Sequence, residues 1–459
     1  MIAPSGFRVL VVGLGVTGDA VLRWAYGRGH AVTVVDDRPA TVRPERRAVA
    51  DALGIEIVAP PIGPEADALL GRVDLVVPSP GVPEGHPILQ AALRAGVARR
   101  SEVDLAAEVL AAAGRSLVAI TGTNGKTTVT ELTVAMCLAS GIEAVAAGNI
   151  GAPLLDEAQR AGDGLVVAEV SSFQLALTTS AFRPRAAALC NLADDHLDWH
   201  RTFEAYARAK ARIFAAQGPE DLLVYNADDP VVAALAAEAP GRTVAFTVAP
   251  GAAAGYRVVI GATGRTLVAA DGRELLAVDG LADDAPHDLA NVLAAAALAL
   301  EVGATPAGVA AAVRDFTKGA HRVQVVAEAD GIRYVDDSKA TNVHAALAAI
   351  RGFPRVVLIA GGRNKGLDLG ALRTGSDHLV GVVAIGDAAP EVVAAFRGAV
   401  PVTVATTMAE AVGAARAFAH PGDVVLLSPA CASFDWYGSY AERGDDFAGE
   451  VLRQTEVHR

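Results

Sequence analysis

The sequence predicts an α/β protein with three domains: a Rossmann-like N-terminal domain, a central P-loop domain with extra antiparallel strands, and a Rossmann-like C-terminal domain. Short apolar runs alternate with helical stretches along most of the chain. Glycine-rich turns directly follow several of these runs. The length of 459 residues exceeds what one hydrophobic core serves. We place the domains at residues 1–104, 105–318 and 319–459.

The first domain begins with a buried-strand pattern at Arg8–Val12, followed by the turn GLGVTG and a second apolar run, Val32–Val35. This run ends on Asp36, 18 residues after the last glycine of the turn, as in dinucleotide-binding folds. The same turn geometry holds any diphosphate on a sugar or nucleoside, so the motif indicates phosphate rather than nicotinamide. A third run, Asp74–Val77, leads to Ser79, which either contacts a ligand or serves the turn itself.

The second domain opens with SLVAITGTNGKTTVT, residues 116–130, in which an apolar strand leads into a glycine-containing turn and a helix start. This pattern predicts a phosphate-binding loop in the short form G-x-x-G-K-T-T. Backbone N–H groups would converge on phosphate oxygens, and the helix N-terminus would add its positive dipole end. Lys126 would reach the terminal phosphates and Thr127 would place a hydroxyl on Mg²⁺. The expected ATP contacts in this loop are Gly122, Thr123, Asn124, Gly125, Lys126, Thr127 and Thr128.

Composition excludes several classes of partner. The 39 basic and 52 acidic residues give a net charge of −13, which argues against nucleic acid or an anionic membrane. The three cysteines, Cys137, Cys190 and Cys431, show no metal or disulfide spacing, which fits a reducing compartment. The longest apolar run, Leu289–Ala304, is alanine-rich and interrupted, as in a packed helix. With no signal peptide evident, we expect a cytoplasmic protein.

Three further residues in the second domain have side chains that could take part in metal binding or catalysis. Glu169 ends an apolar run beside the phosphate loop, where a metal ligand belongs, although it could also be a solvated strand-end acid. His196 follows another strand and lies among three aspartates, which favours a ligand over a purely structural histidine. Lys210 follows fourteen residues later on a predicted helix, and sequence alone would place it at the surface.

Polar loops follow apolar strands in the third domain. They read DDSKATN (336–342), GGRNKG (361–366) and SPACASFD (428–435), and together they place three ligand loops on one edge of one sheet. At the start of this domain Arg322 follows His321. Its guanidinium either clamps a phosphate or forms a salt bridge at the domain junction.

The motifs GTNGKTT, EVSSFQL, DDH, DDSKATN and SPACASFD together resemble the Mur ligase family. The resemblance extends from GLGVTG to the C-terminal SYAERGDDF. It implies three α/β domains that bind a UDP-sugar, ATP and an amino acid in that order. The last two motifs resemble the members that add D-glutamate to UDP-N-acetylmuramoyl-L-alanine in peptidoglycan synthesis. The resemblance implies an acyl-phosphate intermediate and two Mg²⁺ ions, and we expect a monomer.

The resemblance also implies site residues, grouped by ligand. The UDP-substrate set is Val16, Thr17, Asp36, Arg38, Ser79, Gly81, Asn149 and Ser171. The metal set is Thr127, Glu169, His196 and a carbamylated Lys210. Further nucleotide contacts are Asn291, Arg322, Asp337 and Lys339. The amino-acid pocket is Thr341, Lys365, Ser433, Phe434 and Tyr440. Catalytic roles fall to Lys126, His196 and Lys210.

One position departs from the family pattern. The family usually has His-Asn-x-x-Asn before the long helix, whereas this chain has His287, Asp288 and Asn291. An ionised Asp288 only accepts hydrogen bonds and would be unfavourable close to ATP phosphates. Asp288 is compatible with a nearby phosphate only if it points away, meets a metal ion or is protonated.

Three other functions remain open. A related amide ligase such as folylpolyglutamate synthetase shares the phosphate loop but is not expected to carry DDSKATN or SPACAS. An oxidoreductase using GLGVTG would leave the phosphate loop, Glu169 and the third domain without a role. A non-catalytic nucleotide-binding switch would lack amino-acid-dependent ATP turnover.

Overall fold

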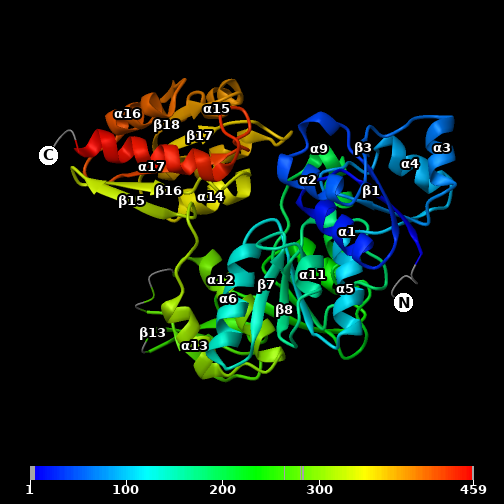
Figure 1. Ribbon diagram of the computed structural model, residues 1–459. Coiled ribbons are helices and arrows are strands. Elements are labelled where there is room, and N and C mark those ends of the chain that lie inside the picture. The colour runs from blue at the N-terminus through cyan, green and yellow to red at the C-terminus, as the bar shows by residue number, and fades with distance from the viewer. Residues whose placement is uncertain (1–5, 263, 280, 282–283, 457–459) are drawn as a thin grey trace. The chain divides into compact units, whose positions relative to one another are not determined.

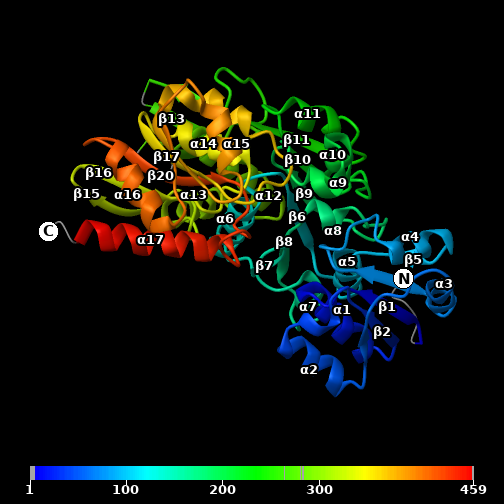
Figure 2. The same cartoon turned by 90° about the horizontal axis from the view of Figure 1, so that it is seen from above.

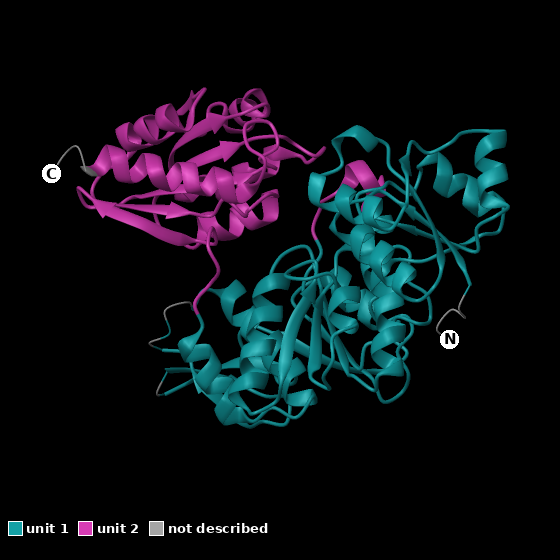
Figure 3. Cartoon of the chain, viewed as in Figure 1, with its two compact units in different colours: residues 1–192, 204–316 teal, residues 193–203, 317–459 magenta. Residues whose placement is uncertain are grey.

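The computed structural model describes residues 6–262, 264–279, 281 and 284–456, and it contains three β-sheets (Figure 1). The chain forms two compact units, Met1–Leu192 with Glu204–Phe316 and Ala193–Phe203 with Thr317–Arg459 (Figure 3). The predicted mixed α/β fold is confirmed. The first unit holds two of the three sheets, and the three domain ranges stay predictions.

The first sheet is entirely parallel, with strand order β3-β2-β1-β4-β5. Its strands are β1 (Arg8–Val12), β2 (Ala31–Val35), β3 (Ile57–Val58), β4 (Leu75–Pro78) and β5 (Ala98–Arg99). The accompanying helices are α1 (Val16–Gly27), the 3₁₀ helix η1 (Pro39–Thr41), α2 (Pro44–Ala52), α3 (Pro64–Leu70) and α4 (Pro87–Arg94). The strand order reverses between β1 and β4, the position at which Rossmann-type sheets bind ligands.

The second sheet runs in the order β14-β13-β12-β11-β10-β9-β6-β8-β7. Its parallel strands are β6 (Leu117–Thr121), β7 (Ala144–Gly148), β8 (Leu165–Glu169), β9 (Ala186–Leu189), β10 (Leu222–Asn226) and β11 (Arg242–Thr247). An antiparallel ribbon of β12 (Tyr256–Gly261), β13 (Gly264–Val268) and β14 (Glu274–Ala277) follows. The extra antiparallel strands predicted for the central domain are thus confirmed. β7 and β11 were not predicted.

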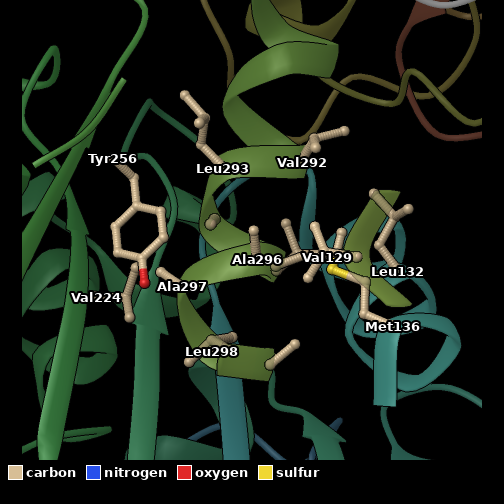
Figure 4. Packing of buried hydrophobic residues seen from close by; sticks show 14 of the residues in the cluster. Val129, Leu132, Met136, Val224, Tyr256, Val292, Leu293, Ala296, Ala297 and Leu298 are labelled. Atoms are coloured by element: carbon tan, nitrogen blue, oxygen red, sulfur yellow. The ribbon is translucent and has the colours of Figure 1, made fainter. Parts of the chain in front are cut away.

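Helices fill the rest of the first unit. They are α5 (Glu102–Ala112), α6 (Lys126–Ala139), α7 (Leu154–Ala158), α8 (Ser172–Leu175), α10 (Phe203–Ala211), α11 (Pro230–Ala236), α12 (Pro286–Glu301) and α13 (Pro306–Asp315). Figure 4 shows α12 packed against α6 and the sheet through fully buried side chains such as Ala296, Val129 and Met136. The small alanines let the two helices approach closely. The alanine-rich run is therefore a packed helix, as predicted.

The third sheet has the order β15-β16-β20-β17-β18-β19 and is parallel except for β15 at its edge. Its strands are β15 (Gln324–Ala329), β16 (Ile332–Asp336), β17 (Val356–Gly361), β18 (Leu379–Ile385), β19 (Val402–Val404) and β20 (Val424–Ala430). One face is covered by α14 (Val343–Arg351), the 3₁₀ helix η2 (Leu369–His378) and α15 (Ala389–Phe396). The other is covered by α16 (Met408–Phe418) and α17 (Tyr440–Glu456) (Figure 2).

The segment Ala193–Phe203, which groups with the second unit, contains the short helix α9 (Leu197–His200). In the part of the chain that the structure describes, no helix combines the length and the apolar character needed to cross a membrane.

Candidate active site

The phosphate loop joins β6 to α6 and requires glycine at two positions. A Cβ on Gly122 would come within 2.9 Å of the Cβ of Cys190. Gly125 has φ of +81°, and a Cβ there would lie 2.3 Å from Oδ1 of Asn291 on α12. α6 begins directly after Gly125, so its N-terminus adjoins the loop, an arrangement that suits an anion. Thr127 and Thr128 lie in this first turn.

Asn191, to which no role was assigned from the sequence, holds this loop from the end of the neighbouring strand β9. Its side chain accepts from the backbone N of Asn124 at 2.8 Å and donates to the Asn124 carbonyl at 3.0 Å. The backbone N of Thr123 donates to the Asn191 carbonyl at 2.8 Å. The hydroxyl groups of Thr123 and Tyr206 lie 2.9 Å apart. The loop is therefore shaped by its surroundings before a ligand arrives.

Two lysine side chains converge on one carbonyl oxygen of the loop. Lys126 Nζ donates to the carbonyls of Gly122 and Thr123 at 2.9 and 2.8 Å. Lys210 Nζ, from α10, donates to the same Gly122 carbonyl at 2.7 Å. Lys210 is only 2 % exposed, and its ammonium lies 4.8 Å from the centre of the Tyr206 ring. The surface position that sequence alone suggested for Lys210 is therefore wrong. Two cations at one oxygen create a positive potential suited to phosphate.

Glu169 lies at the end of β8 and is 2 % exposed. Its Oε1 accepts from Asn149 Nδ2 at 2.7 Å, and the Asn149 backbone N donates to the Glu169 carbonyl at 2.8 Å. Its Oε2 is buried and has no hydrogen-bond partner among the described residues. Burying an unpaired carboxylate oxygen is costly unless a cation meets it. The donor chemistry of Glu169 and of the nearby phosphate loop thus fits Mg²⁺.

Groups of three or more His, Cys, Asp or Glu side chains able to hold a metal are absent from the described residues. Lys210 belongs to the first unit and His196 to the second, so their predicted pairing on a metal stays a prediction. Asn149 was assigned to the UDP-substrate, and in the structure its amide is bonded to Glu169.

The remaining predicted residues of the second sheet lie close to the loop or cap a helix. Asn291 faces Gly125, which suits a nucleotide contact. Asp288, the residue that departs from the family pattern, is buried. Its Oδ1 lies 3.4 Å from Nε2 of His287, so the imidazole of His287 lies beside this carboxylate. Ser171 caps α8 in a reciprocal arrangement with Gln174, which gives it a local structural role.

The predicted UDP-substrate residues of the N-terminal sheet gather at the carboxyl ends of β1, β2 and β4. Asp36 does not present a free carboxylate, because Oδ2 accepts from the backbone N of Leu14 at 2.8 Å and Oδ1 from that of Arg38 at 2.9 Å. Ser79 Oγ donates to the Gly13 carbonyl at 2.7 Å. Both side chains therefore fix the glycine-rich turn. Val16 and Thr17 begin α1, while Arg38 and Gly81 are exposed.

The three polar loops of the third sheet follow β16, β20 and β17, which are neighbours, so the predicted common edge is confirmed. Arg363 and Ala432 exchange two backbone hydrogen bonds, which joins the loops after β17 and β20. The fully buried Arg443 joins the loops after β16 and β20, since it donates to Ser338 Oγ, the Ser338 carbonyl and the Cys431 carbonyl. Burial lowers the pKa of the Arg443 guanidinium to about 10.

The side chains on these loops differ in their burial and in their interactions. Lys339 Nζ lies 5.3 Å from the centre of the Tyr440 ring, so two predicted contacts are neighbours. Asp337 is buried and accepts from Ser428 Oγ at 2.8 Å and from the Val323 backbone N at 3.3 Å. Burial raises the pKa of Asp337 to about 7. Its carboxyl group therefore has a structural role in this unit.

The amino-acid set occupies the same loops. Thr341 lies after β16, Lys365 after β17 and Ser433 after β20. Phe434 is 65 % exposed, which is unusual for a large apolar side chain beside buried loops and suits a ligand contact. Arg322 lies two residues before the start of β15, and its predicted phosphate contact stays a prediction.

Comparison with known proteins covers the whole chain. Family models match in three segments: the Mur ligase MurD-like N-terminal domain at residues 7–99, the Mur ligase middle domain at 120–299, and the Mur ligase glutamate ligase domain at 321–431. A protein of Frankia casuarinae named UDP-N-acetylmuramoylalanine–D-glutamate ligase is 46 % identical over 98 % of this chain and 95 % of its own length. The chain belongs to the Mur ligase family. The resemblance predicted from the sequence motifs is confirmed.

A second relative of this Mur ligase, from Thermobifida fusca, has the same name and is 42 % identical over 97 % of this chain and 98 % of its own. Among solved structures, the MurF ligase of Thermotoga maritima in complex with ADP matches with a TM-score of 0.61 at 18 % identity, covering 100 % of this chain and 98 % of that one. At this identity the match shows a shared fold.

We predict that Asn191→Ala weakens ATP binding about tenfold, because the phosphate loop loses both side-chain hydrogen bonds to Asn124. Isothermal titration with a non-hydrolysable ATP analogue measures the change. Asn226→Ala is the matched control, since Asn226 ends the adjacent strand β10 and caps a local turn only. Equal affinities for wild type and Asn191→Ala would contradict the role of Asn191.

We also predict a pH-dependent stability difference for Asp337→Asn. The folded-state pKa of Asp337 is about 7 against 3.8 for the unfolded chain, so the native state retains a proton that the unfolded state has lost. Stability from this group falls as pH rises from about 4 to about 7. Asparagine cannot ionise, so the variant should gain at least about 1 kcal/mol relative to wild type between pH 5 and pH 8.

Differential scanning calorimetry at both pH values tests this, with Asp377→Asn, an exposed aspartate of η2, as the control. If wild type and Asp337→Asn lose stability in parallel as pH rises, Asp337 is ionised in the native state and the prediction is wrong.

Proposed function

We propose that this Mur ligase joins D-glutamate to UDP-N-acetylmuramoyl-L-alanine and converts ATP to ADP and phosphate. The convergence of Lys126 and Lys210 on the Gly122 carbonyl is the observation that carries the phosphoryl-transfer part. The substrates follow from the names of relatives that match nearly the full chain. ATP as nucleotide is further supported by the ADP complex of the Thermotoga maritima neighbour.

A carboxylate is a poor electrophile, so the first step activates it. A carboxylate oxygen of the UDP-substrate attacks the γ-phosphorus of ATP, the bond to the bridging oxygen breaks, and ADP leaves. This gives an acyl phosphate. Lys126 and the first-turn N–H groups of α6 are placed to stabilise the charge on the transferring phosphoryl group. Bound Mg²⁺, held by Glu169 Oε2 and the Thr127 hydroxyl, would offset phosphate charge.

The second step forms the amide bond. The neutral amine of D-glutamate attacks the acyl carbon, and the tetrahedral intermediate expels phosphate, which keeps the substrate's former carboxylate oxygen. The proton lost by the amine goes to a base, which is either His196 or a group bound to the metal. Lys365 and the loop containing Ser433 would orient the carboxylates of D-glutamate and so supply proximity.

We further propose that Lys210 is carbamylated in the active enzyme. Two ammonium groups on one carbonyl oxygen repel each other, and Lys210 is almost completely buried. Carbamylation replaces one of the two cations with an anion, which removes the repulsion and supplies a further oxygen ligand for a metal. The UDP-substrate contacts, the second metal ion at His196 and a monomeric state are part of the same proposal.

We place the reaction in the cytoplasm. All three cysteines are free and buried, which suits a reducing compartment. Burial beside the phosphate loop raises the pKa of Cys190 to about 12, so this thiol is not a nucleophile near neutral pH.

The direct test measures phosphate release from ATP and Mg²⁺ with UDP-N-acetylmuramoyl-L-alanine and, in parallel, D-glutamate, L-glutamate, L-lysine or no amino acid. We expect release with D-glutamate alone, together with the amide product in the mass spectrum. Turnover with another amino acid would assign the chain to a different Mur ligase activity. No turnover in any reaction, with ATP binding intact, would favour a nucleotide switch.

We predict that Lys126→Ala and Lys210→Ala each lower kcat/KM about a hundredfold or more, because each removes charge from the phosphate loop. If Lys210 is carbamylated, short carboxylic acids should partly restore Lys210→Ala but not Lys126→Ala. Arg208→Ala is the matched control, since Arg208 lies on the same helix and pairs with Glu238 at the surface. Equal restoration of both lysine variants, or of neither, would contradict carbamylation of Lys210.

A further inference from the structure

The segment Ala193–Phe203 follows a strand of the second sheet but groups with the second unit (Figure 3). Asp195 is its buried anchor, with 5 % of its surface exposed. Its Oδ1 accepts from Lys365 Nζ at 3.2 Å and from the His196 backbone N at 2.9 Å. Its Oδ2 accepts from Asn342 Nδ2 at 3.2 Å. One carboxylate thus contacts two of the loops that hold the predicted amino-acid pocket.

The orientations of the Asn342 and Lys365 side chains, which donate to Asp195, are restricted by their other interactions. Asn342 caps α14, and its Oδ1 accepts from the Ala345 backbone N at 2.9 Å. Its Nδ2 must therefore point away from the helix, and it meets Asp195. Lys365 has three N–H donors, and the bond to Asp195 fixes one of them. Since a long ammonium side chain otherwise samples many rotamers, this bond limits the directions in which the other two donors point.

The backbone around Asp195 is strained in a way that requires an anchor. His196 has φ of +54° and Arg201 has φ of +68°, and neither is glycine. Such left-handed conformations persist only where the surroundings hold them. They flank α9 in an eleven-residue segment, for which the Asp195 carboxylate supplies a buried, charge-assisted attachment to the second unit.

We propose that Asp195 is a positioning residue for binding of the incoming amino acid. It holds the Lys365 ammonium in the orientation that receives a substrate carboxylate, and it fixes the segment carrying His196 to the second unit. The proposal rests on the proposed function, because a carboxylate-bearing amino acid is the ligand that Lys365 would bind. Asp195 itself contacts no reacting atom in this scheme.

The first test is a KM comparison in the full-length enzyme with Mg²⁺. Asp195→Asn keeps the size of the side chain and one acceptor oxygen but removes the charge. We expect its KM for D-glutamate to rise about tenfold, while KM for ATP and for the UDP-substrate change less than about twofold. Asp198→Asn, an exposed aspartate on α9, is the matched control and should resemble wild type.

A double-variant cycle distinguishes positioning of Lys365 from an independent effect. If Asp195 acts through Lys365, then Lys365→Gln raises KM for D-glutamate, and adding Asp195→Asn to it produces little further rise. If the rise in KM for D-glutamate in the double variant equals the product of the rises in the two single variants, the proposal is overturned. An equal rise of all three substrates' KM values would also overturn it, since that indicates a general structural defect.

Hydrogen exchange provides a readout that does not depend on activity. The amides of residues 193–203 should exchange faster in Asp195→Asn than in wild type, while those of β17 and β20 remain unchanged. Unchanged exchange in this segment would overturn the anchor even in an active enzyme. Absence of D-glutamate turnover in the wild type would instead overturn the proposed function, so the two failures are distinguishable.

Discussion

The carbonyl oxygen of Gly122 accepts hydrogen bonds from two lysine ammonium groups, and the nucleotide site is arranged around this concentration of charge. Asn191 holds the loop from the end of β9, and Asn291 on α12 leaves no room for a side chain at Gly125. The unpartnered oxygen of Glu169 adds a ligand for a cation. The phosphate loop therefore suits an anionic ligand, and the proposed Mg²⁺ would accompany it.

The same principle of strand-end loops operates in all three sheets. Parallel strands bring their carboxyl ends to one edge, where each sheet carries a different set of polar side chains. In the second unit the loops are joined to one another by Arg443 and by the Arg363–Ala432 bonds. The segment around Asp195 is bonded to two of these loops, so the residues that would receive the amino acid form one connected network.

Sequence patterns predicted the strands that carry the site, because buried strands and glycine-rich turns are local signals. They did not predict β7, whose alanine-rich sequence has weak strand propensity. A sequence pattern also shows which type of side chain is present, but not the direction in which that side chain points. Asp36 and Asp337 are predicted ligand contacts, and in the structure their carboxyl groups accept hydrogen bonds from Leu14 and from Ser428, which lie on neighbouring strand ends. Asn191, Arg443 and Asp195 act through contacts distant in sequence, which a single chain without aligned relatives does not reveal.

In the proposed mechanism, ATP activates the carboxylate of the UDP-substrate through an acyl phosphate. The most direct measurement uses UDP-N-acetylmuramoyl-L-alanine labelled with oxygen-18 in its carboxylate, together with ATP, Mg²⁺ and D-glutamate. We expect one labelled oxygen in the released phosphate for each amide formed, because that oxygen attacks the γ-phosphorus. Unlabelled phosphate accompanying labelled amide product would contradict it, since the carboxylate would then have been activated by another route.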